Sequence, residues 1–545
     1  LGIEYDEENK ETELLPVFKN IYDKNKNLLN EWNQYKLDKK KYLDEVKLAL
    51  DKAIYGHEEA KSQIHRVIAQ WATGEQNGYV FGFQGPPGCG KTSLAKKGLT
   101  KCLKDENGNS RPFAFVALGG SCNGSTLEGH NYTYVGSTWG RICDILMESK
   151  CLNPIIFIDE LDKVSESPQG KEITGILTHM TDPTQNDTFQ DKYFSGVDID
   201  LSKALIIFSY NDASKVDSIL RDRIHEVNFK PSALPEKIVI SKKYMIPELC
   251  KTIGFGDEII MPDDVLEFII NTYTYEAGCR KLNQKLMEIY RDINLRYQMG
   301  IPANGKKIDF PFIITKEFLT EDIFIDKPKV TIKQILPKPK IGLVNGLYAT
   351  ATGLGGLTLV ECFIMPSETK LRLELTGQQG DVMKESMSVA KTVAYNILPM
   401  EIKNKIHKRW KDEGPFGIHI HCPDGGTPKD GPSAGAAITT CIYSVLTGIP
   451  VNNKIGITGE IDLNGSVHAI GGLYSKVRGA KAAGCNLVLC PYENKNDVDA
   501  ILKDEFTPID DNFKIKMVNN IWEVLELLLV ENKLEPVDFT KQILI

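Results

Sequence analysis

Three kinds of feature are missing from this chain of 545 residues. Its twelve cysteines contain no CxxC pair, so neither a zinc site nor a disulfide framework is indicated. No apolar run is long enough to cross a bilayer, and no secretory signal is present. Lys and Arg number 65 against 73 Asp and Glu, so no general positive charge favours nucleic acid or an anionic membrane as partner.

Length and composition indicate several folded domains. The chain is 42% hydrophobic and 25% charged, as in ordinary globular proteins, and its length corresponds to about three or four domains. It begins at Leu1 rather than Met, so we expect a fragment. The scattered cysteines favour a reducing intracellular compartment. We expect the cytoplasm, with an organellar matrix such as that of the mitochondrion as the alternative if a targeting segment was removed.

Residues 79–99 have the pattern of a phosphate-binding loop. A buried strand over 79–84 precedes a full match to GxxxxGK[ST], namely Gly85, Pro86, Pro87, Gly88, Cys89, Gly90, Lys91 and Thr92. The glycines let backbone N–H groups surround phosphates, Lys91 neutralises the β and γ oxygens, and Thr92 offers a hydroxyl to Mg²⁺. A helix over 93–99 directs its positive end toward the anion. The sequence therefore predicts binding of ATP with Mg²⁺.

A second apolar strand, over residues 154–158, ends in two acids. Its continuous apolar character is typical of a buried parallel strand. Asp159 can hold Mg²⁺ through water, and Glu160 can polarise an attacking water. Behind a phosphate-binding loop, this acid pair favours ATP hydrolysis over the kinase or GTPase uses of the same fold.

These motifs resemble those of the AAA+ family. Residues 205–210 and Asn211 are similar to the sensor-1 strand, which makes Asn211 the candidate γ-phosphate sensor. Residues 220–223 resemble the arginine-finger segment, with Arg223 preferred over Arg221. The stretch 273–282 resembles the sensor-2 helix and implies that Arg280 reaches the nucleotide. Because an arginine finger acts across a subunit boundary, the resemblance implies a ring.

Shifts in composition predict five segments. Residues 1–50 are polar and helical, with an apolar stripe (Leu28, Trp32, Tyr35, Tyr42, Leu43 and Val46) that we expect to lie on the next domain rather than to bind a partner. Gly56 is expected to break this helix. The other segments are an α/β ATPase domain over 51–235, a helical lid over 236–325, a Pro- and Lys-containing linker over 326–345, and a final domain of strands and Gly-rich turns over 346–545.

The final domain contains a candidate nucleophile in the stretch from Thr427 to Gly435. A turn-forming segment delivers Ser433 to the start of a buried helix, where unpaired backbone N–H groups suit a developing oxyanion. A plain helix N-cap explains the same serine. No His-Asp pair stands at a known hydrolase spacing. Lys476, after the turn Gly471-Gly472, is a candidate base, but spacing alone does not bring it to Ser433.

Two histidines occupy one face of a predicted strand. His419 and His421 alternate with Ile418 and Ile420 and precede Cys422. A metal site built from these three residues is one interpretation. Since no further ligand cluster accompanies them, structural histidines near an active site are the preferred interpretation.

Several segments of the final domain resemble the Lon protease domain. They are residues 428–435, Thr458-Gly459-Glu460-Ile461, residues 471–476, and Gly380 through Ser386. The ATPase half adds further Lon-like segments at Gly129-His130, residues 133–136 and residues 182–186. The resemblance covers about residues 50 to 540 and implies a multidomain α/β fold. In it, an AAA+ P-loop α/β domain with a helical lid precedes an α+β protease domain of the Lon type.

The resemblance implies an ATP-dependent serine protease with a Ser–Lys dyad. Ser433 would be the nucleophile and Lys476 the base, its pKa depressed by burial, with Thr458 orienting the lysine. His419, His421, Asp430 and Glu385 map to positions lining the site. Tyr134 and Val135 resemble the aromatic–hydrophobic pore-loop pair that grips substrate, although ordinary loop packing would also explain them. The implied partners are unfolded or damaged proteins and further copies of the chain in a hexamer, with no membrane.

Two other functional classes stay open. One is an AAA+ remodeller or chaperone without proteolysis, which the presence of both Ser433 and Lys476 disfavours. The other is a DNA-binding scaffold, because some Lon proteins bind DNA, but the acidic balance gives it no support. Trp139 departs from the Lon pattern, which commonly has Pro there. Only about fifty residues precede the ATPase part, where Lon proteins generally carry a large N-terminal region that recognises substrates. We therefore expect either a truncated chain or a different selection of substrates.

Overall fold

The computed structural model describes residues 16–530, apart from 75–77, 105–108, 120–122, 165–166, 257, 306, 351–352, 424–428 and 505. Side chains of residues 16–24 and 73 are also outside the description, as are Thr427 and Pro428 of the predicted serine loop. The chain divides into two compact units, Leu1–Gln84 with Gly90–Phe229, and Gly85–Cys89 with Lys230–Ile545. Among the described helices, none combines the length and apolar character needed to cross a membrane.

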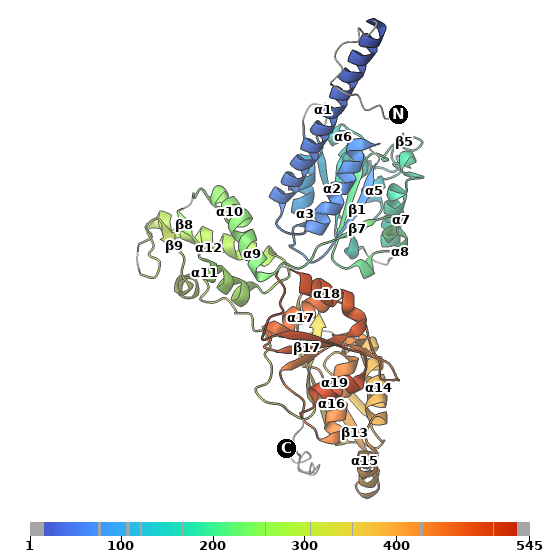
Figure 1. Ribbon diagram of the computed structural model, residues 1–545, viewed down its shortest axis with the longest axis vertical. Coiled ribbons are helices and arrows are strands. Elements are labelled where there is room, and N and C mark those ends of the chain that lie inside the picture. Colours follow the sequence, from blue (N-terminus) through green and yellow to red (C-terminus); the bar gives the residue numbers. More distant parts are fainter. Residues whose placement is uncertain are drawn as a thin grey trace. The chain divides into compact units, whose positions relative to one another are not determined.

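The first unit is built on a five-stranded parallel sheet in the order β2-β3-β6-β1-β7. In Figure 1, β1 and β7 of this sheet lie among the helices of the same unit. Its strands are Tyr79–Gln84 (β1), Phe113–Ala117 (β2), Ile155–Asp159 (β3), Leu205–Tyr210 (β6) and His225–Asn228 (β7). β3 and β6 are the predicted apolar strands and lie side by side, with Ile158 opposite Phe208. Their side chains are buried because helices cover both faces of a parallel sheet. Asp159 and Asn211 therefore end up at the same edge.

Helices connect and cover these strands. After β1 a continuous helix spans residues 91–102 (α3, η1 and α4), and α6 (Arg141–Ser149), α7 (Pro168–Thr181) and α8 (Ser218–Arg221) follow between later strands. Short elements complete the unit: α5 (Ser125–Glu128), η2 (Leu161–Lys163), η3 (Asn186–Thr188), η4 (Ala213–Lys215), β4 (Phe189–Gln190) and β5 (Asp198–Ile199). The core side chains on one side of the sheet come mainly from β3, β6, α6 and α7.

The N-terminal helix differs in part from the prediction. α1 (Pro16–Ala53) ends before Gly56, whose φ of 68° breaks the helix, and α2 (Glu58–Thr73) follows. Val46 is buried as expected, but Leu28, Trp32 and Tyr35 are about half exposed. The expected packing of this end of the stripe was therefore wrong. Trp32 and Tyr35 instead stack on each other, with a lysine amine over each ring.

The second unit begins with a helical part. α9 (Leu234–Ile240), α10 (Ile246–Ile253), α11 (Asp263–Ile269) and α12 (Arg280–Met299) surround a core to which α12 contributes Leu282, Leu286, Ile289, Tyr290 and Ile293. These core positions recur at three- and four-residue steps and so line one face of α12. Short elements accompany them: β8 (Ile259–Ile260), β9 (Phe312–Ile313), α13 (Lys316–Phe318), and the single turns η5 (Ser241–Met245), η6 (Ile270–Thr274) and η7 (Leu319–Ile323). Residues 325–339 form neither helix nor strand.

A seven-stranded mixed sheet follows in the order β12-β13-β11-β10-β14-β17-β18. The strands are Leu343–Ala349 (β10), Gly355–Pro366 (β11), Leu373–Thr376 (β12), Phe416–His421 (β13), Ile455–Ile457 (β14), Leu487–Pro491 (β17) and Lys514–Val518 (β18). β11 pairs antiparallel with β10 and β13, whereas β12–β13, β10–β14, β14–β17 and β17–β18 are parallel. A small hairpin, β15 (Glu460–Ile461) and β16 (Val467–His468), joins β14 to the next helix.

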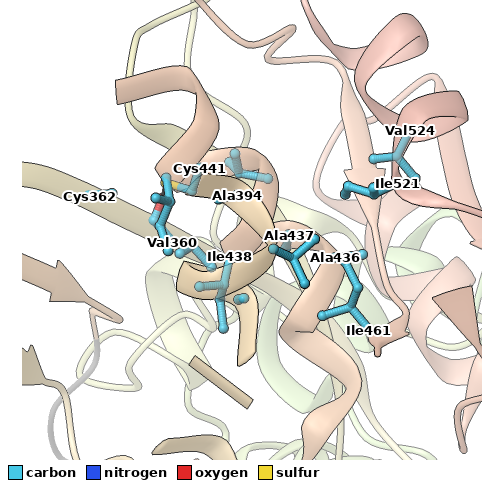
Figure 2. Close-up of a cluster of buried hydrophobic side chains, with 14 of the residues drawn as sticks. Val360, Cys362, Ala394, Ala436, Ala437, Ile438, Cys441, Ile461, Ile521 and Val524 are labelled. Atoms are coloured by element: carbon cyan, nitrogen blue, oxygen red, sulfur yellow. Dashed lines mark hydrogen bonds between the residues drawn. The ribbon is translucent and has the colours of Figure 1, made fainter. Parts of the chain in front are cut away.

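Helices cover both faces of this sheet. One core joins α14 (Asp381–Asn396), α16 (Gly435–Thr447) and α19 (Ile521–Leu528) to Val360 and Cys362 of β11 (Figure 2). The helix α15 (Met400–Asp412) adds Ile406 to this core. The other core joins α17 (Leu473–Ala482) and α18 (Lys495–Lys503) to Leu357 of β11. Alternate side chains of β11 point to opposite faces, so it contributes to both cores. The candidate serine and lysine helices, α16 and α17, therefore pack on opposite faces of one sheet.

Candidate active site

Ser433 lies in a single helical turn, η8 (Pro432–Ala434), directly before α16. The N-cap position of α16 is Ala434, and no side-chain cap bond is made there. The helix-cap explanation of Ser433 is therefore wrong. α16 begins at this point because the apolar run from Ala436 onward is buried against β11 and α14 (Figure 2). Ser433 itself is half-buried.

Lys476 lies in the first turn of α17, which begins after Gly472 with a φ of 70°. Its backbone N–H donates to Gly472 O at 3.1 Å. The helix lies against the start of β11. A Cβ at Gly479 of α17 would lie 2.3 Å from the backbone of Gly355, and a Cβ at Gly355 of β11 would lie 1.8 Å from the backbone of Ser475. Only glycine leaves space for this approach, which explains why Gly355 and Gly479 are glycines. The sequence motifs did not indicate the importance of these two residues.

Thr458 connects the two residues. Lys476 Nζ donates to Thr458 Oγ1 at 3.1 Å, and Thr458 Oγ1 donates to the carbonyl oxygen of Ser433 at 3.2 Å. The N–H of Gly459 also donates to this carbonyl, at 2.8 Å. Thr458 is completely buried and its own N–H donates to Leu489 O of β17. The sheet therefore holds one hydroxyl between the lysine helix and the serine turn.

The surroundings of Lys476 favour a neutral amine. The side chain is buried with 3% exposure, and no carboxylate forms an ion pair with it in the described part of the chain. Burial penalises the ammonium form and lowers the pKa of Lys476 to about 8. A substantial fraction of neutral amine, about a tenth, is then present at pH 7. Such an amine can act as a general base.

The histidine pair lies next to the predicted site segments and shares one partner. Thr376 Oγ1 of β12 is 2.9 Å from His419 Nε2 and 2.7 Å from His421 Nδ1. Thr376 was not predicted from the sequence, although it directly follows the alternating apolar and polar residues from Leu371 to Leu375. Within the described residues, no group of three or more His, Cys, Asp and Glu side chains is arranged to hold a metal ion. The structure therefore supports hydrogen-bonded histidines rather than the metal interpretation.

Asp430 connects the serine loop to α14. Its Oδ1 accepts the N–H of Met383 at 3.0 Å and the N–H of Gly431 at 2.9 Å. A Cβ at Gly380 would lie 2.3 Å from this carboxyl group, so the glycine is needed for the approach. The negative group at the start of α14 also complements the helix dipole. Glu385, in contrast, is exposed on α14.

In the first unit, the predicted nucleotide residues gather at the carboxyl edge of the sheet. Buried Lys91 donates from Nζ to Asn211 Oδ1 at 2.8 Å. Asp159 ends β3, and its Oδ1 accepts the N–H of Glu160 at 3.0 Å. Glu160 has a φ of 61°, a strained conformation that often marks functional residues. Its carboxylate lies so close to Gly119 that a Cβ there would be only 1.7 Å from Glu160 Oε2. The sequence motifs did not indicate this glycine.

Asp162 is a further residue that the sequence did not single out. It lies in η2, and its Oδ2 accepts the N–H groups of Asn211 and Asp212 at 3.2 and 3.3 Å. This contact fixes the backbone of the candidate γ-phosphate sensor. Its position three residues after Asp159 is the only signal in the sequence that could have suggested it.

The phosphate-binding loop has the backbone that its glycines predict. Gly85, Gly88 and Gly90 have φ values of 151°, 80° and 91°. In the second unit, Gly88 O accepts the N–H of Cys279 at 3.1 Å, and a Cβ at Gly88 would meet Arg280 N at 2.9 Å. The start of α12 is thus placed directly against Gly88, as a sensor-2 role for Arg280 requires.

Arg221 and Arg223 are bound differently. Arg221 makes a two-pronged ion pair with Glu226, from Nε at 2.7 Å and Nη2 at 3.2 Å. Arg223 donates from Nη2 to Asp182 Oδ2 at 3.1 Å and from Nη1 to Ile219 O at 3.0 Å. Both arginines are thus occupied within the chain, by different acids.

The predicted pore residues lie on the loop between α5 and α6. The side chain of Tyr134 is 66% exposed and Val135 is fully exposed. The base of the loop is fixed, since His130 N donates to Thr138 O and Gly140 N to the buried carboxylate of Asp191. Ordinary packing therefore does not explain these two side chains.

Trp139 takes the place of the proline expected in this loop. Its ring stacks on Phe194 and meets the edge of Tyr193, and its Nε1 donates to Asp144. These side-chain contacts fix the loop at a position where Lon proteins commonly have a proline, whose ring restricts the backbone directly.

Comparison with known proteins identifies three parts of the chain. Residues 314–531 match the Lon protease (S16) C-terminal proteolytic domain, residues 81–232 the ATPase family associated with various cellular activities (AAA), and residues 254–304 the Lon protease AAA+ ATPase lid domain.

Curated relatives cover most of the chain. A Lon protease homolog of Acanthamoeba polyphaga mimivirus is 38% identical over 541 residues, which is 89% of this chain and 52% of the relative. The Lon protease of Campylobacter concisus is 36% identical over 517 residues, and that of Campylobacter jejuni is 37% identical over 511. Each of these two alignments includes 91% of this chain and 61% of the relative. The chain thus spans between about half and three fifths of their length. It carries the ATPase, lid and proteolytic domains of the Lon protease family and belongs to that family.

Proposed function

We propose that this chain is an ATP-dependent endopeptidase that cleaves peptide bonds with Ser433 and Lys476. The main support is the hydrogen-bonded connection from Lys476 through Thr458 to Ser433. The amine of Lys476 is also buried and makes no ion pair with a carboxylate among the described residues. A buried, unpaired lysine is costly to keep charged, which suits a base and not a structural ion pair. The relatives named Lon protease support the same class of reaction.

In the proposed reaction, the Ser433 hydroxyl attacks the carbonyl carbon of the substrate while neutral Lys476 accepts its proton. Lys476 gives this proton to the leaving amine as the C–N bond breaks, and an ester on Ser433 remains. Water then hydrolyses the ester with Lys476 again as base, which releases the new carboxyl end and restores Ser433. Thr458 orients the amine through both steps.

ATP with Mg²⁺ fits the residues of the phosphate-binding loop. The positive φ values of Gly85, Gly88 and Gly90 give the loop a backbone that can curve around phosphates, and Lys91 would neutralise the phosphate charge beside Asn211. Thr92 and Asp159 would hold Mg²⁺, which when bound neutralises charge on the phosphate oxygens. Glu160 would polarise the attacking water, and Arg280 would contact the nucleotide from the lid.

Hydrolysis would drive the unfolding and translocation of protein substrates. Tyr134 and Val135, both exposed on a loop with a fixed base, would grip unfolded or damaged proteins. Arg223 would act as an arginine finger toward the nucleotide of a neighbouring copy, in a ring that we propose to be a hexamer.

The pH dependence of peptide cleavage tests the dyad. Deprotonated Lys476 is the active form, so kcat/KM for a short fluorogenic peptide should rise with pH through about 8 and level off about one unit above it. Since burial places the pKa below that of an ordinary lysine, the rise comes earlier than for an exposed amine. Initial rates from pH 6 to 10 at saturating ATP give the curve.

ATP hydrolysis measured in the same buffers is the control for general effects of pH. Between about pH 8 and 10, Lys476 binds more protons in the unfolded chain than in the folded one. The free energy of unfolding that this residue contributes therefore rises with pH. Loss of structure therefore does not imitate the rise. A flat profile, or a midpoint near pH 6.5, would argue against Lys476 as the base.

Tyr134→Ala tests the proposed grip on substrates. Removing the exposed ring should slow ATP-dependent degradation of casein about tenfold and leave cleavage of a short peptide unchanged, because a short peptide needs no pulling. Degradation is followed by release of acid-soluble fragments.

Tyr132→Ala is the matched control, since Tyr132 is 67% exposed on the same loop. A smaller effect there would assign the grip to Tyr134. Equal loss of casein and peptide cleavage in Tyr134→Ala would contradict a pore role.

A further inference from the structure

One Lon-like segment, residues 182–186, has no role in the reaction described so far. It follows α7, which ends at Thr181. Pro183 restricts the preceding residue to extended backbone, and Asp182 has φ −80° and ψ 114°. The carbonyl of Asp182 accepts the N–H groups of Gln185 and Asn186 at 3.0 and 2.9 Å. The backbone at Asp182 is thus fixed from both sides.

The carboxylate of Asp182 is fixed as well. Its Oδ1 accepts the N–H of Thr184 at 3.0 Å and the Thr184 hydroxyl at 2.7 Å. These two donors, and Arg223 after them, lower the pKa of Asp182 to about 2. The group is therefore a permanent anion at any pH at which the ATPase would work. Its second oxygen, Oδ2, is left for Arg223.

Arg223 is held at two of its nitrogens. Nη2 donates to Asp182 Oδ2, and Nη1 donates to Ile219 O. The Ile219 carbonyl is itself fixed, because Asp217 caps α8 by accepting the N–H groups of Ile219 and Leu220 at 2.9 and 3.2 Å. An arginine has five N–H donors, so the other three make no hydrogen bond to the described residues.

The ion pair borders an open space. A cleft of about 450 Å³ is lined by Arg223, Asp182, Lys171 and His179, among others. The Arg223 side chain is 31% exposed and that of Asp182 is 16% exposed. Part of the Arg223 side chain is thus accessible from outside the chain, and Asp182 is the more enclosed partner.

We propose that Asp182 is a positioning residue that holds the guanidinium of Arg223 ready for the phosphates of a neighbouring copy. The inference rests on the proposed function, in which Arg223 is the arginine finger. A free arginine side chain has many rotamers and loses this freedom when it binds phosphate. Arg223 already makes two hydrogen bonds, to a rigid carboxylate and a rigid carbonyl, before it meets the nucleotide. Most of the loss of side-chain entropy therefore does not fall on the binding of phosphate.

The test is the ATPase rate of Asp182→Asn in the full chain. Asparagine keeps the bonds from Thr184 to Oδ1, but its amide nitrogen cannot accept from Arg223. We expect kcat to fall about three- to tenfold with KM for ATP unchanged, because the finger acts on the reacting phosphate and not on binding. Glu226→Gln, which weakens the pair of Arg221 in the same way, should keep the normal rate. Thermal unfolding of each variant checks that the fold is retained.

A double mutant separates a role through Arg223 from a structural one. If Asp182 acts through Arg223, the variants Arg223→Ala and Asp182→Asn/Arg223→Ala should have the same kcat within a factor of about two. A further drop in the double mutant overturns the inference, and so does a normal kcat in Asp182→Asn while Arg223→Ala is slow. A normal rate in Arg223→Ala would instead refute the finger itself, and with it this part of the proposed function.

Discussion

Ser433→Ala should abolish peptide-bond cleavage while ATP hydrolysis continues. Removal of a serine nucleophile can cost on the order of a millionfold in kcat, so neither casein nor a short peptide should be cut at a measurable rate. The substitution removes only Oγ, and within the described residues this atom makes no hydrogen bond. The carbonyl of Ser433, which accepts from Thr458 and Gly459, is unchanged. The fold should therefore survive.

The measurement compares cleavage with and without ATP for the wild type and the variant. Ser388→Ala is a suitable control, since this exposed serine of α14 bonds Lys384 O of its own helix and no other group of the described residues. Cleavage that persists in Ser433→Ala would show that another group is the nucleophile. Loss of cleavage together with loss of ATP hydrolysis would indicate damage to the chain and not to the chemistry.

Glu160→Gln should bind ATP and fail to hydrolyse it. The amide cannot accept a proton or polarise water as the carboxylate does, and loss of such a group costs about a hundred- to ten-thousandfold in rate. Glutamine has the same shape, so the contact with Gly119 and the unusual backbone at residue 160 can persist. Degradation of folded proteins should stop with the ATPase, whereas short peptides should still be cut.

Phosphate release gives the hydrolysis rate, and a fluorescent ATP analogue gives the affinity. Glu148→Gln serves as the control because this exposed acid of α6 pairs with Arg141, at 3.3 Å, and with no other cation among the described residues. ATPase activity close to normal in Glu160→Gln would contradict the assigned role. Weak nucleotide binding in that variant would mean that Glu160 supports the loop and not the reaction.

The ATPase motifs could be located from the sequence because they are local. Gly85 to Thr92 carry their backbone requirements in their own residue types, and the φ values of the three glycines follow from that. Apolar runs such as 155–158 and 205–208 require burial on both faces, which a parallel sheet provides. Asp162 and Gly119 were not predicted, because each matters only through a segment that the sheet brings next to it.

The peptidase site is the opposite case. The residue types of Ser433 and Lys476 are visible in the sequence, yet Ser433 alone was as well explained by a helix cap. The structure removes that explanation, since the cap position is Ala434. The apolar stripe of the N-terminal helix was also misjudged, because periodicity shows that a face is apolar but not how much of it another segment covers.

The family resemblance, the phosphate-binding loop and the types of residue available for chemistry can be read from the order of the amino acids. Three features depend on the folded chain: Thr458 joins Lys476 to the serine turn, Asp182 holds Arg223, and Lys476 is buried with no ion pair to a carboxylate among the described residues. Backbone preferences belong to a residue and its neighbours in the chain, whereas the pKa and the direction of a side chain depend on segments that meet only after folding.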